Sequence, residues 1–237
     1  MRATLLKLSM VIAALLANPV VGQELRSTEI IERALRAKPD MEAGKRIYRE
    51  HCSACHGANA YGNADEVIPS LAGQLPIYVI KQLVDLAEGA RTSADMHRIA
   101  AKQPVSTPQG LSDIAAYLGT LDPNPKPQTG DGSQLAMGKR YYQGLCAYCH
   151  GAQGGGNEAR ATPALRRQHY SYLLMQMRDL SAEHRYSVDL EIVDTLQRLS
   201  YDQLSAIADY ASRLPMAGDV LANFEQDAPK PARSTPP

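Results

Sequence analysis

The chain is poor in large aromatic side chains. Its 237 residues include one phenylalanine and no tryptophan, beside twelve tyrosines. Large aromatic rings usually supply much of the apolar area that a protein core buries. A chain of this length forms one large domain or two small ones. We therefore expect another large apolar body to fill the core or cores.

Net charge is also absent. The 25 basic residues balance the 25 acidic residues. Residues 1–22 contain two basic residues, Arg2 and Lys7, and no acidic one, so removal of this segment changes the formal charge from 0 to −2. Proteins that bind nucleic acid present a strongly basic surface. The composition therefore predicts no nucleic-acid partner.

Long apolar runs are missing after the N-terminus. Residues 1–22 combine two basic residues with an apolar run from Leu8, which is typical of a secretory signal peptide, here cleaved after Gly22. An uncleaved anchor is the alternative, but Pro19 interrupts a run shorter than the ~20 residues of a membrane-spanning helix. We therefore expect a protein that is soluble in the periplasm, with peripheral contact at the membrane surface left open.

Cysteine is scarce, and all four cysteines belong to two copies of one motif. Cys-x-x-Cys-His is the attachment signature of c-type haem. Its two thiols form thioethers with the porphyrin, and its histidine gives iron a proximal nitrogen. The motifs predict two covalently bound haem c groups, held by Cys52 and Cys55 with His56 as the iron ligand, and by Cys146 and Cys149 with His150.

Zinc and disulfide bonds are the alternatives for these cysteines. Cysteine pairs of small zinc modules lie about 12–20 residues apart, whereas Cys55 and Cys146 are much farther apart. Two disulfides are feasible in an exported protein. Neither alternative explains a histidine after both pairs, and a porphyrin also supplies the apolar body that cores poor in aromatic residues need.

The two motifs lie in two copies of one domain. A shift of 94 residues relates the motifs without a gap and also pairs Gly44/Gly138, Tyr48/Tyr142, Pro69/Pro163, Gln74/Gln168, Tyr78/Tyr172, Gln82/Gln176 and Arg91/Arg185. Near the end the shift becomes 93, which indicates a one-residue deletion in a tandem duplication. The expected parts are a signal peptide (1–22), an N-terminal extension helix (23–40), a first domain (41–121), a linker (122–134), a second domain (135–215) and a tail (216–237), disordered at its end.

The fold class is expected to be all-α, because neither copy shows the alternation of a strand. Ser200 and Gln203 have the spacing of a helix capping box. The linker begins with a stiff proline-rich stretch and ends in a glycine-rich one expected to be flexible. The expected helices run from about Met41 and Leu135 to the motifs, over Pro76–Glu88 and Ser171–Glu183, and from Thr107 and Ser200 to the domain ends.

The second axial ligand decides whether such a haem only carries electrons. Iron held by histidine and methionine is saturated, and methionine raises its reduction potential. Met96 is the one methionine between the first motif and the linker, and we expect it to be the sixth ligand, in the loop between the second and last helices. Core filling is the alternative role. The adjacent His97 is expected to be a surface residue.

The second copy departs from this pattern. Leu190 stands at the position of Met96, and leucine cannot bind iron. His184, earlier in the same loop, is the first substitute and would give bis-histidine ligation. An open or water-bound position is the next alternative. The remaining candidates are His169, Met175, Met177 and Met216.

The chain resembles the class I c-type cytochromes, most closely the tandem diheme cytochrome c4 family. The resemblance covers residues 41–121 and 135–214. It implies two all-α haem domains packed about a pseudo-twofold axis. It rests on the paired Cys-x-x-Cys-His-Gly motifs, the stretch Pro69-x-Leu71-Ala-Gly-Gln74, the helix with Tyr78, Gln82, Asp85 and Arg91, and the closing helix from Leu111 to Tyr117.

The resemblance also implies roles for residues near the haems. The carbonyl groups of Pro69 and Pro163 would orient the proximal histidines. Arg91 and Arg185 would approach haem propionates, with a solvated helix end as the alternative for both. His169 is interpreted as structural.

Electron transfer is the leading functional hypothesis. The resemblance implies a periplasmic carrier that passes single electrons towards a terminal oxidase of the respiratory chain, from a dehydrogenase, or to another cytochrome. The alternative is a redox enzyme or enzyme subunit that uses the unusual second haem, for example in sulfur-compound oxidation or peroxide reduction. A haem-based sensor is a third hypothesis, for which the chain offers no signalling domain.

Overall fold

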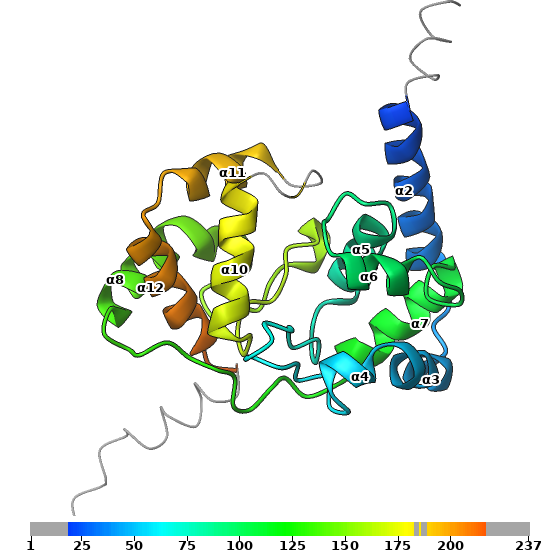
Figure 1. Cartoon of the computed structure of the whole chain (residues 1–237), viewed down its shortest axis with the longest axis horizontal. Coiled ribbons are helices and arrows are strands. Elements are labelled where there is room, and N and C mark those ends of the chain that lie inside the picture. Colours follow the sequence, from blue (N-terminus) through cyan, green and yellow to red (C-terminus); the bar gives the residue numbers. More distant parts are fainter. Residues whose placement is uncertain (1–18, 183–184, 186–188, 217–237) are drawn as a thin grey trace, which may run out of the picture.

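The computed structural model describes residues 19–182, 185 and 189–216. These residues form helices and loops, and their only β-type pairings are three isolated bridges, so the all-α prediction is confirmed. Figure 1 shows two helical halves side by side, joined by an extended linker. Within the described ranges, no helix is long and apolar enough to cross a membrane.

The two halves repeat one helical plan. Domain 1 contains α3 (Met41–His51), α4 (Ser53–His56), α5 (Pro76–Ala87), α6 (Ala94–Ala100) and α7 (Pro108–Gly119). Domain 2 contains α8 (Leu135–Tyr141), the π-helix η1 (Tyr142–Cys146), α9 (Ala147–His150), the 3-10 helix η2 (Glu158–Arg160), α10 (Tyr170–Ser181), α11 (Leu190–Gln197) and α12 (Tyr201–Ser212).

The first and last helices of each domain cross at a glycine. A Cβ atom at Gly44 of α3 would collide with the carbonyl oxygen of Asp113 in α7, and one at Gly138 of α8 would collide with that of Ala206 in α12. Only glycine allows so close an approach of two backbones. The helix that precedes each cysteine motif therefore meets the last helix of its domain at an equivalent glycine in both domains.

Side chains cap several helices where the sequence predicts helix starts. Asp40 accepts hydrogen bonds from the backbone N–H groups of Glu42 and Ala43 at the start of α3. Ser200 and Gln203 form the predicted capping box at the start of α12. Such caps satisfy backbone N–H groups that have no partner inside the helix.

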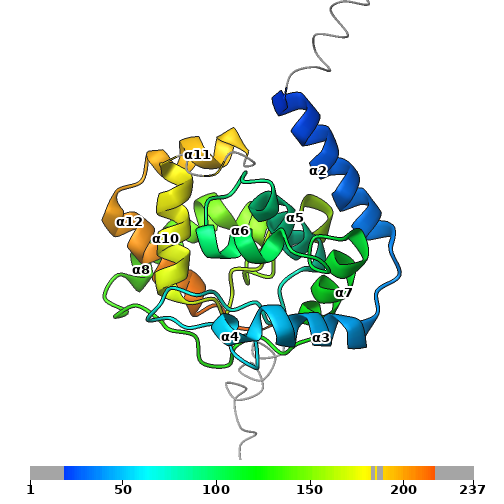
Figure 2. The ribbon, with the colours of Figure 1, turned by 45° about the vertical axis from the view of Figure 1, so that its right-hand side comes forward.

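An extension helix covers one side of domain 1. Helix α2 spans Pro19–Arg36, so it begins before the expected start at residue 23 and includes the predicted cleavage point, whereas residues 1–18 lie outside the described part. Ala34 is fully buried, and Ile30 and Ile31 pack against the domain 1 core. The N-terminal end of α2 projects beyond the domain (Figure 2).

The two domains are joined by reciprocal hydrogen bonds. The Gln74 side chain bonds the backbone N–H and C=O of Ala164 at 2.9 and 3.0 Å. The Gln168 side chain bonds the same groups of Ser70 at 2.9 and 2.8 Å. Because the shift of 94 residues pairs Gln74 with Gln168 and Ser70 with Ala164, the contact has pseudo-twofold symmetry.

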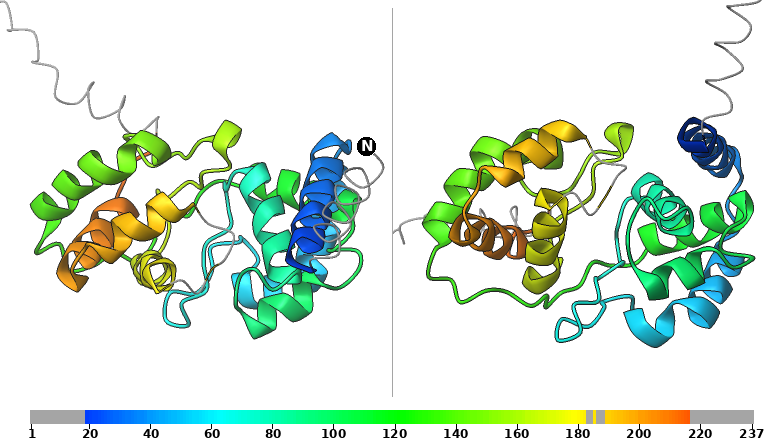
Figure 3. Two further views of the ribbon diagram at one scale, coloured as in Figure 1. Left: turned by 90° about the horizontal axis from the view of Figure 1, so that it is seen from above. Right: turned by 45° about the horizontal axis from the view of Figure 1, so that its top comes forward.

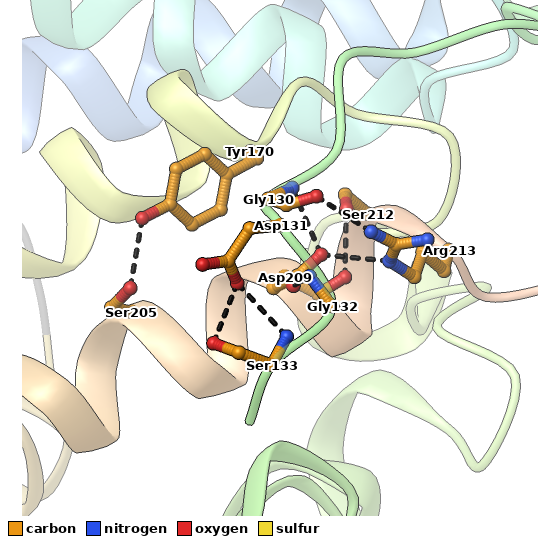
Figure 4. Close-up of polar contacts among 9 residues, drawn as sticks. All are labelled: Gly130, Asp131, Gly132, Ser133, Tyr170, Ser205, Asp209, Ser212 and Arg213. Atoms are coloured by element: carbon orange, nitrogen blue, oxygen red, sulfur yellow. Dashed lines mark hydrogen bonds and ion pairs between the residues drawn. The ribbon is translucent and has the colours of Figure 1, made fainter. Parts of the chain in front are cut away.

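The glycine-rich end of the linker is held in place, although the sequence predicts flexibility there. Asp209 of α12 accepts hydrogen bonds from the backbone N–H groups of Gly130 and Gly132, each at 2.9 Å, and pairs with Arg213 at 2.7 Å (Figure 4). Figure 3 shows the linker running along one side of both domains. The linker is therefore part of the packed structure.

Candidate haem-binding sites

Each histidine of the two motifs is oriented by one backbone carbonyl group. His56 Nδ1 lies 3.0 Å from the oxygen of Pro69, and His150 Nδ1 lies 2.9 Å from the oxygen of Pro163. A carbonyl oxygen only accepts hydrogen bonds, so Nδ1 carries the proton and Nε2 presents a lone pair. These are the two hydrogen bonds that the resemblance implies. They fix the tautomer and ring orientation that an iron ligand needs.

Burial keeps both imidazoles neutral. It lowers the pKa of His56 and that of His150, although the hydrogen bonds to Pro69 and Pro163 oppose this shift. Desolvation disfavours the charged form of histidine. A metal-binding imidazole must be neutral, so the environment suits iron ligation.

All four motif cysteines are free thiols in the structure. Burial raises the pKa of Cys52 to about 12 and that of Cys146 to about 11. No disulfide links them, and the described residues contain no cluster of three His, Cys, Asp or Glu side chains suited to a metal ion. All four thiols are therefore available for thioether attachment of porphyrins.

Met96 lies in a helix and not in a loop as expected. It belongs to α6, is half-buried and packs against the domain 1 core. The backbone of His97 is in the same helix, and its exposed side chain bonds the carbonyl oxygen of Leu86 at 2.9 Å. This bond gives His97 a structural role, while iron ligation by Met96 stays a prediction.

The corresponding position of domain 2 faces solvent. Leu190 begins α11 and is 79% exposed. His184 lies outside the described residues, so its predicted ligation has no structural counterpart. Among the other candidates, Met175 and Met177 lie in α10, and Met177 packs at the edge of the domain 2 core.

His169 is not free to bind iron. Its Nδ1 accepts a hydrogen bond from the backbone N–H of Gln128 at 3.0 Å, and its Nε2 lies 2.7 Å from the carbonyl oxygen of Tyr61. Both ring nitrogens are thus used to join the linker, domain 2 and domain 1. This agrees with the structural role expected for His169.

Arg91 and Arg185 meet at the contact between the domains. Arg91 donates to the side-chain oxygens of Gln82 and Gln176, and Arg185 donates to the same two atoms. Arg91 also donates to the Tyr172 hydroxyl at 2.7 Å. The backbones of the two arginines form an antiparallel bridge. Neither arginine is therefore a solvated helix end.

One buried donor in this cluster is unsatisfied. Arg185 Nε has no hydrogen-bond partner although it is inaccessible to solvent. A buried guanidinium N–H without an acceptor is costly. A carboxylate such as a haem propionate would satisfy it, so the residues present fit the cofactor that the motifs predict.

Sequence reasoning missed the pairing across the domains. It identified Gln74, Gln168, Gln82 and Gln176 as repeated residues, but it did not predict that each copy bonds the other. Their signal was the repetition of the same polar residue at equivalent positions, just before α5 and α10 for Gln74 and Gln168 and inside these helices for Gln82 and Gln176. Only the packing of the two copies shows which polar groups face each other.

Comparisons with known proteins agree with this geometry. A family model for cytochrome c matches residues 41–122 and 135–214. The chain is 33% identical to a cytochrome c4 of Pseudomonas aeruginosa, over 69% of this chain and 83% of that one. It is 32% identical to a thiosulfate dehydrogenase electron acceptor of Thiomonas intermedia, over 70% and 79%.

Solved structures show the same relationship. The structure of reduced recombinant cytochrome c4 from Pseudomonas stutzeri superimposes with a TM-score of 0.66 and 28% identity, covering 75% of this chain and all of that one. Two tandem matches to one family model, with full coverage of a two-domain relative, establish the family. The chain belongs to the cytochrome c family as a tandem, cytochrome c4-like diheme electron-transfer protein.

Proposed function

We propose that the protein is a periplasmic carrier of single electrons with two covalently bound haem c groups. The observation that carries this proposal is the repeated histidine geometry. In each domain a buried imidazole has Nδ1 bonded to a proline carbonyl and Nε2 left for iron. Two such proximal sites in one chain support two haems.

The chain's own residues hold and enclose the redox centres. Bound haem supplies a one-electron couple between ferrous and ferric iron. Cys52 and Cys55, with their counterparts in domain 2, would attach the porphyrins, and Met96 would complete the ligand set in domain 1. Protein ligands held in fixed positions would limit rearrangement when the charge on iron changes. Electron transfer of this kind needs no side chain to act as acid or base.

Redox proteins are the proposed partners. One relative is named an electron acceptor of thiosulfate dehydrogenase, and another is named a cytochrome subunit of sulfide dehydrogenase, with 38% identity over 84 residues. A dehydrogenase that oxidises a sulfur compound is therefore the first donor to test. The features of residues 1–22 support transfer of the chain to the periplasm.

A second candidate function rests on Leu190. Since leucine stands at the position of Met96 and has no atom that can bind iron, the second haem would have a different sixth ligand or an open position. An open position would allow a role as a redox enzyme or enzyme subunit. This candidate makes domain 2 the reactive half of the molecule.

Spectroscopy of the purified holoprotein tests both candidates. Mass spectrometry should show two haems bound to the chain, and ferrous spectra should be recorded with and without carbon monoxide. Failure of carbon monoxide to bind supports a carrier with two saturated irons. Binding by about half of the haem would favour the second candidate. A chain with one haem or none would contradict the proposal.

A further inference from the structure

A stripe of exposed apolar side chains lies on the motif helices of domain 2. Tyr148, between the two cysteines of the second motif, is 83% exposed, and Leu145 is 46% exposed. Tyr141, one turn earlier, is half-buried. Tyr141 packs against the domain 2 core, Leu145 lies in η1, and Tyr148 follows in α9, three residues after Leu145. We call Tyr141, Leu145 and Tyr148 the Tyr148 stripe.

Two arginines border the Tyr148 stripe. The guanidinium of Arg140 lies 5.1 Å from the centre of the Tyr141 ring, and that of Arg160 lies 5.2 Å from the centre of the Tyr148 ring. Both distances are within the range of cation–π attraction. The stripe is therefore an apolar surface with a positive charge at each end.

Domain 1 lacks this surface at the equivalent positions. The shift of 94 residues places Ile47, His51 and Ala54 where domain 2 has Tyr141, Leu145 and Tyr148. Ile47 is buried in the core. The duplicated fold therefore does not require an exposed apolar stripe, and domain 2 has acquired one.

The charges of the two motif faces also differ. Arg160 of domain 2 replaces Glu66 of domain 1, and Gly144 replaces Glu50. Both glutamates are exposed. Over the whole of the paired segments 45–66 and 139–160, each domain has three Lys or Arg residues, whereas domain 1 has three carboxylates and domain 2 has one, Glu158. A surface of this kind favours a partner that presents carboxylates.

The local helix geometry differs as well. The turn Tyr142–Cys146 is a π-helix, whereas α3 continues as an α-helix to His51. No insertion accompanies the change, because the 94-residue shift holds on both sides of it. Single π-helical turns occur often at functional sites. Here the turn carries Leu145.

We infer that the Tyr148 stripe, with Arg140 and Arg160, is the docking surface for a redox protein that presents carboxylates around a small apolar contact. The inference rests on the proposed function, since Tyr148 stands between the cysteines that would hold the second haem. One electron passes from the reduced centre of the partner to ferric iron of that haem, and no bond forms or breaks. Small apolar contacts bordered by charge suit transient redox complexes.

Binding and reduction by purified thiosulfate dehydrogenase test this surface. The variants are Tyr148→Ser and Arg160→Glu, and the matched controls in domain 1 are Ala54→Ser and Glu66→Arg. We expect each domain 2 variant to raise the Kd about tenfold, which is about 1.4 kcal/mol. The Arg160→Glu effect should vanish at high ionic strength, and the controls should stay within about twofold.

Three outcomes overturn the inference. The first is that the domain 1 variants weaken binding and the domain 2 variants do not. The second is that both sets leave the Kd unchanged. The third is that the wild type dimerises in sedimentation experiments and Tyr148→Ser abolishes the dimer, because the stripe would then be a self-interface.

Oxidation by small molecules tests the docking surface without relying on thiosulfate dehydrogenase as the partner. Arg160→Glu should slow oxidation of the ferrous holoprotein by anionic ferricyanide and accelerate oxidation by a cationic cobalt complex. If thiosulfate dehydrogenase does not bind the wild type, the proposed donor is wrong, and this comparison alone decides the surface. Unchanged rates with both oxidants would overturn the docking surface.

Discussion

At the scale of single residues, backbone carbonyl groups decide which nitrogen of each motif histidine can bind iron. Pro69 and Pro163 hold Nδ1 of His56 and His150 at 3.0 and 2.9 Å. Each carbonyl oxygen accepts a hydrogen bond from Nδ1, which leaves Nε2 as the nitrogen that can bind iron. The two proximal sites are consequently alike, and the differences between the domains lie elsewhere.

Replacement of Met96 should affect one haem only. Met96→Ala is expected to remove the far-red absorption band of methionine-bound ferric iron and to lower the reduction potential of the first haem, because methionine raises it. Carbon monoxide should then bind that haem. Leu190→Ala is the matched control and should change neither property, since Leu190 is exposed. Persistence of the band in Met96→Ala would show that another residue ligates.

Two buried tyrosines should make the fold sensitive to alkali. Burial raises the pKa of Tyr48 and that of Tyr142, and each hydroxyl donates to a backbone carbonyl, that of Gly57 or Gly151. The neutral form is favoured in the folded state, so stability is retained below the unfolded pKa of about 10 and is lost as the pH rises above it.

Urea denaturation of the holoprotein at pH 8 and pH 11 measures this effect. The free energy of unfolding should fall between these values, and less so in Tyr48→Phe, which has no hydroxyl to ionise. An equal fall in wild type and variant would contradict the role of Tyr48.

At the scale of elements, helix α2 distinguishes the two domains. Val84 of α5 is buried, whereas Arg178, its counterpart in α10, is exposed. Helix α2 contacts α5 and α7. The extension therefore covers an apolar side of domain 1. The equivalent side of domain 2 is polar and faces solvent.

A charge placed under α2 should destabilise domain 1. Ala34 is fully buried, so Ala34→Glu would force an unpaired carboxylate into an apolar contact, at a cost of about 2–4 kcal/mol. Leu35→Glu is the control, because the neighbouring Leu35 is 47% exposed and should tolerate the change. Urea denaturation measures both. Equal stability of the two variants would show that α2 does not pack as described.

The linker anchor gives a second prediction at this scale. Asp209→Ala removes the acceptor of two backbone N–H groups and the partner of Arg213, and should lower the free energy of unfolding by about 1–3 kcal/mol. Asp131→Ala is the control, because the exposed Asp131 bonds only Ser133 nearby. A linker without this anchor should also become sensitive to limited proteolysis. Unchanged stability and proteolysis in Asp209→Ala would contradict the anchor.

At the scale of the whole molecule, the domains recognise each other through copies of the same residues. Gln74 bonds the backbone of domain 2, and Gln168 makes the equivalent bonds to the backbone of domain 1. Arg91 and Arg185 both donate hydrogen bonds to the side chains of Gln82 and Gln176. When two copies of one surface pack against each other, each complementary residue acts twice, once in each copy. The same symmetry brings the two arginines together at the contact between the domains, where each would approach a haem propionate.

Removal of both glutamine side chains should loosen this contact. The double variant Gln74→Ala/Gln168→Ala loses four hydrogen bonds between the domains, each worth about 1 kcal/mol. We expect the single unfolding transition to separate into two. Calorimetry measures this, with the exposed Gln143→Ala as a control. A single unshifted transition in the double variant would contradict the importance of the contact.

The sequence by itself determined the cofactor chemistry, the duplication and most helices. Two copies of Cys-x-x-Cys-His and a constant spacing are properties of the chain, and helix starts such as Ser200 depend on residues a few positions apart. These features are local, so they can be predicted without knowing how segments pack. Helix α2 begins at Pro19, four residues before the expected start, and Met96 lies in α6, where a loop was expected.

Only the tertiary structure decided which repeated residues meet and which face solvent. Arg91 could be a solvated helix end until domain 2 is placed against it, and the glycine-rich linker could be flexible until Asp209 binds it. The exposure of Leu190 and Tyr148 likewise depends on the surrounding helices. The interacting groups lie about one domain apart in sequence. They become hydrogen-bonded or buried only when the two copies fold and pack together.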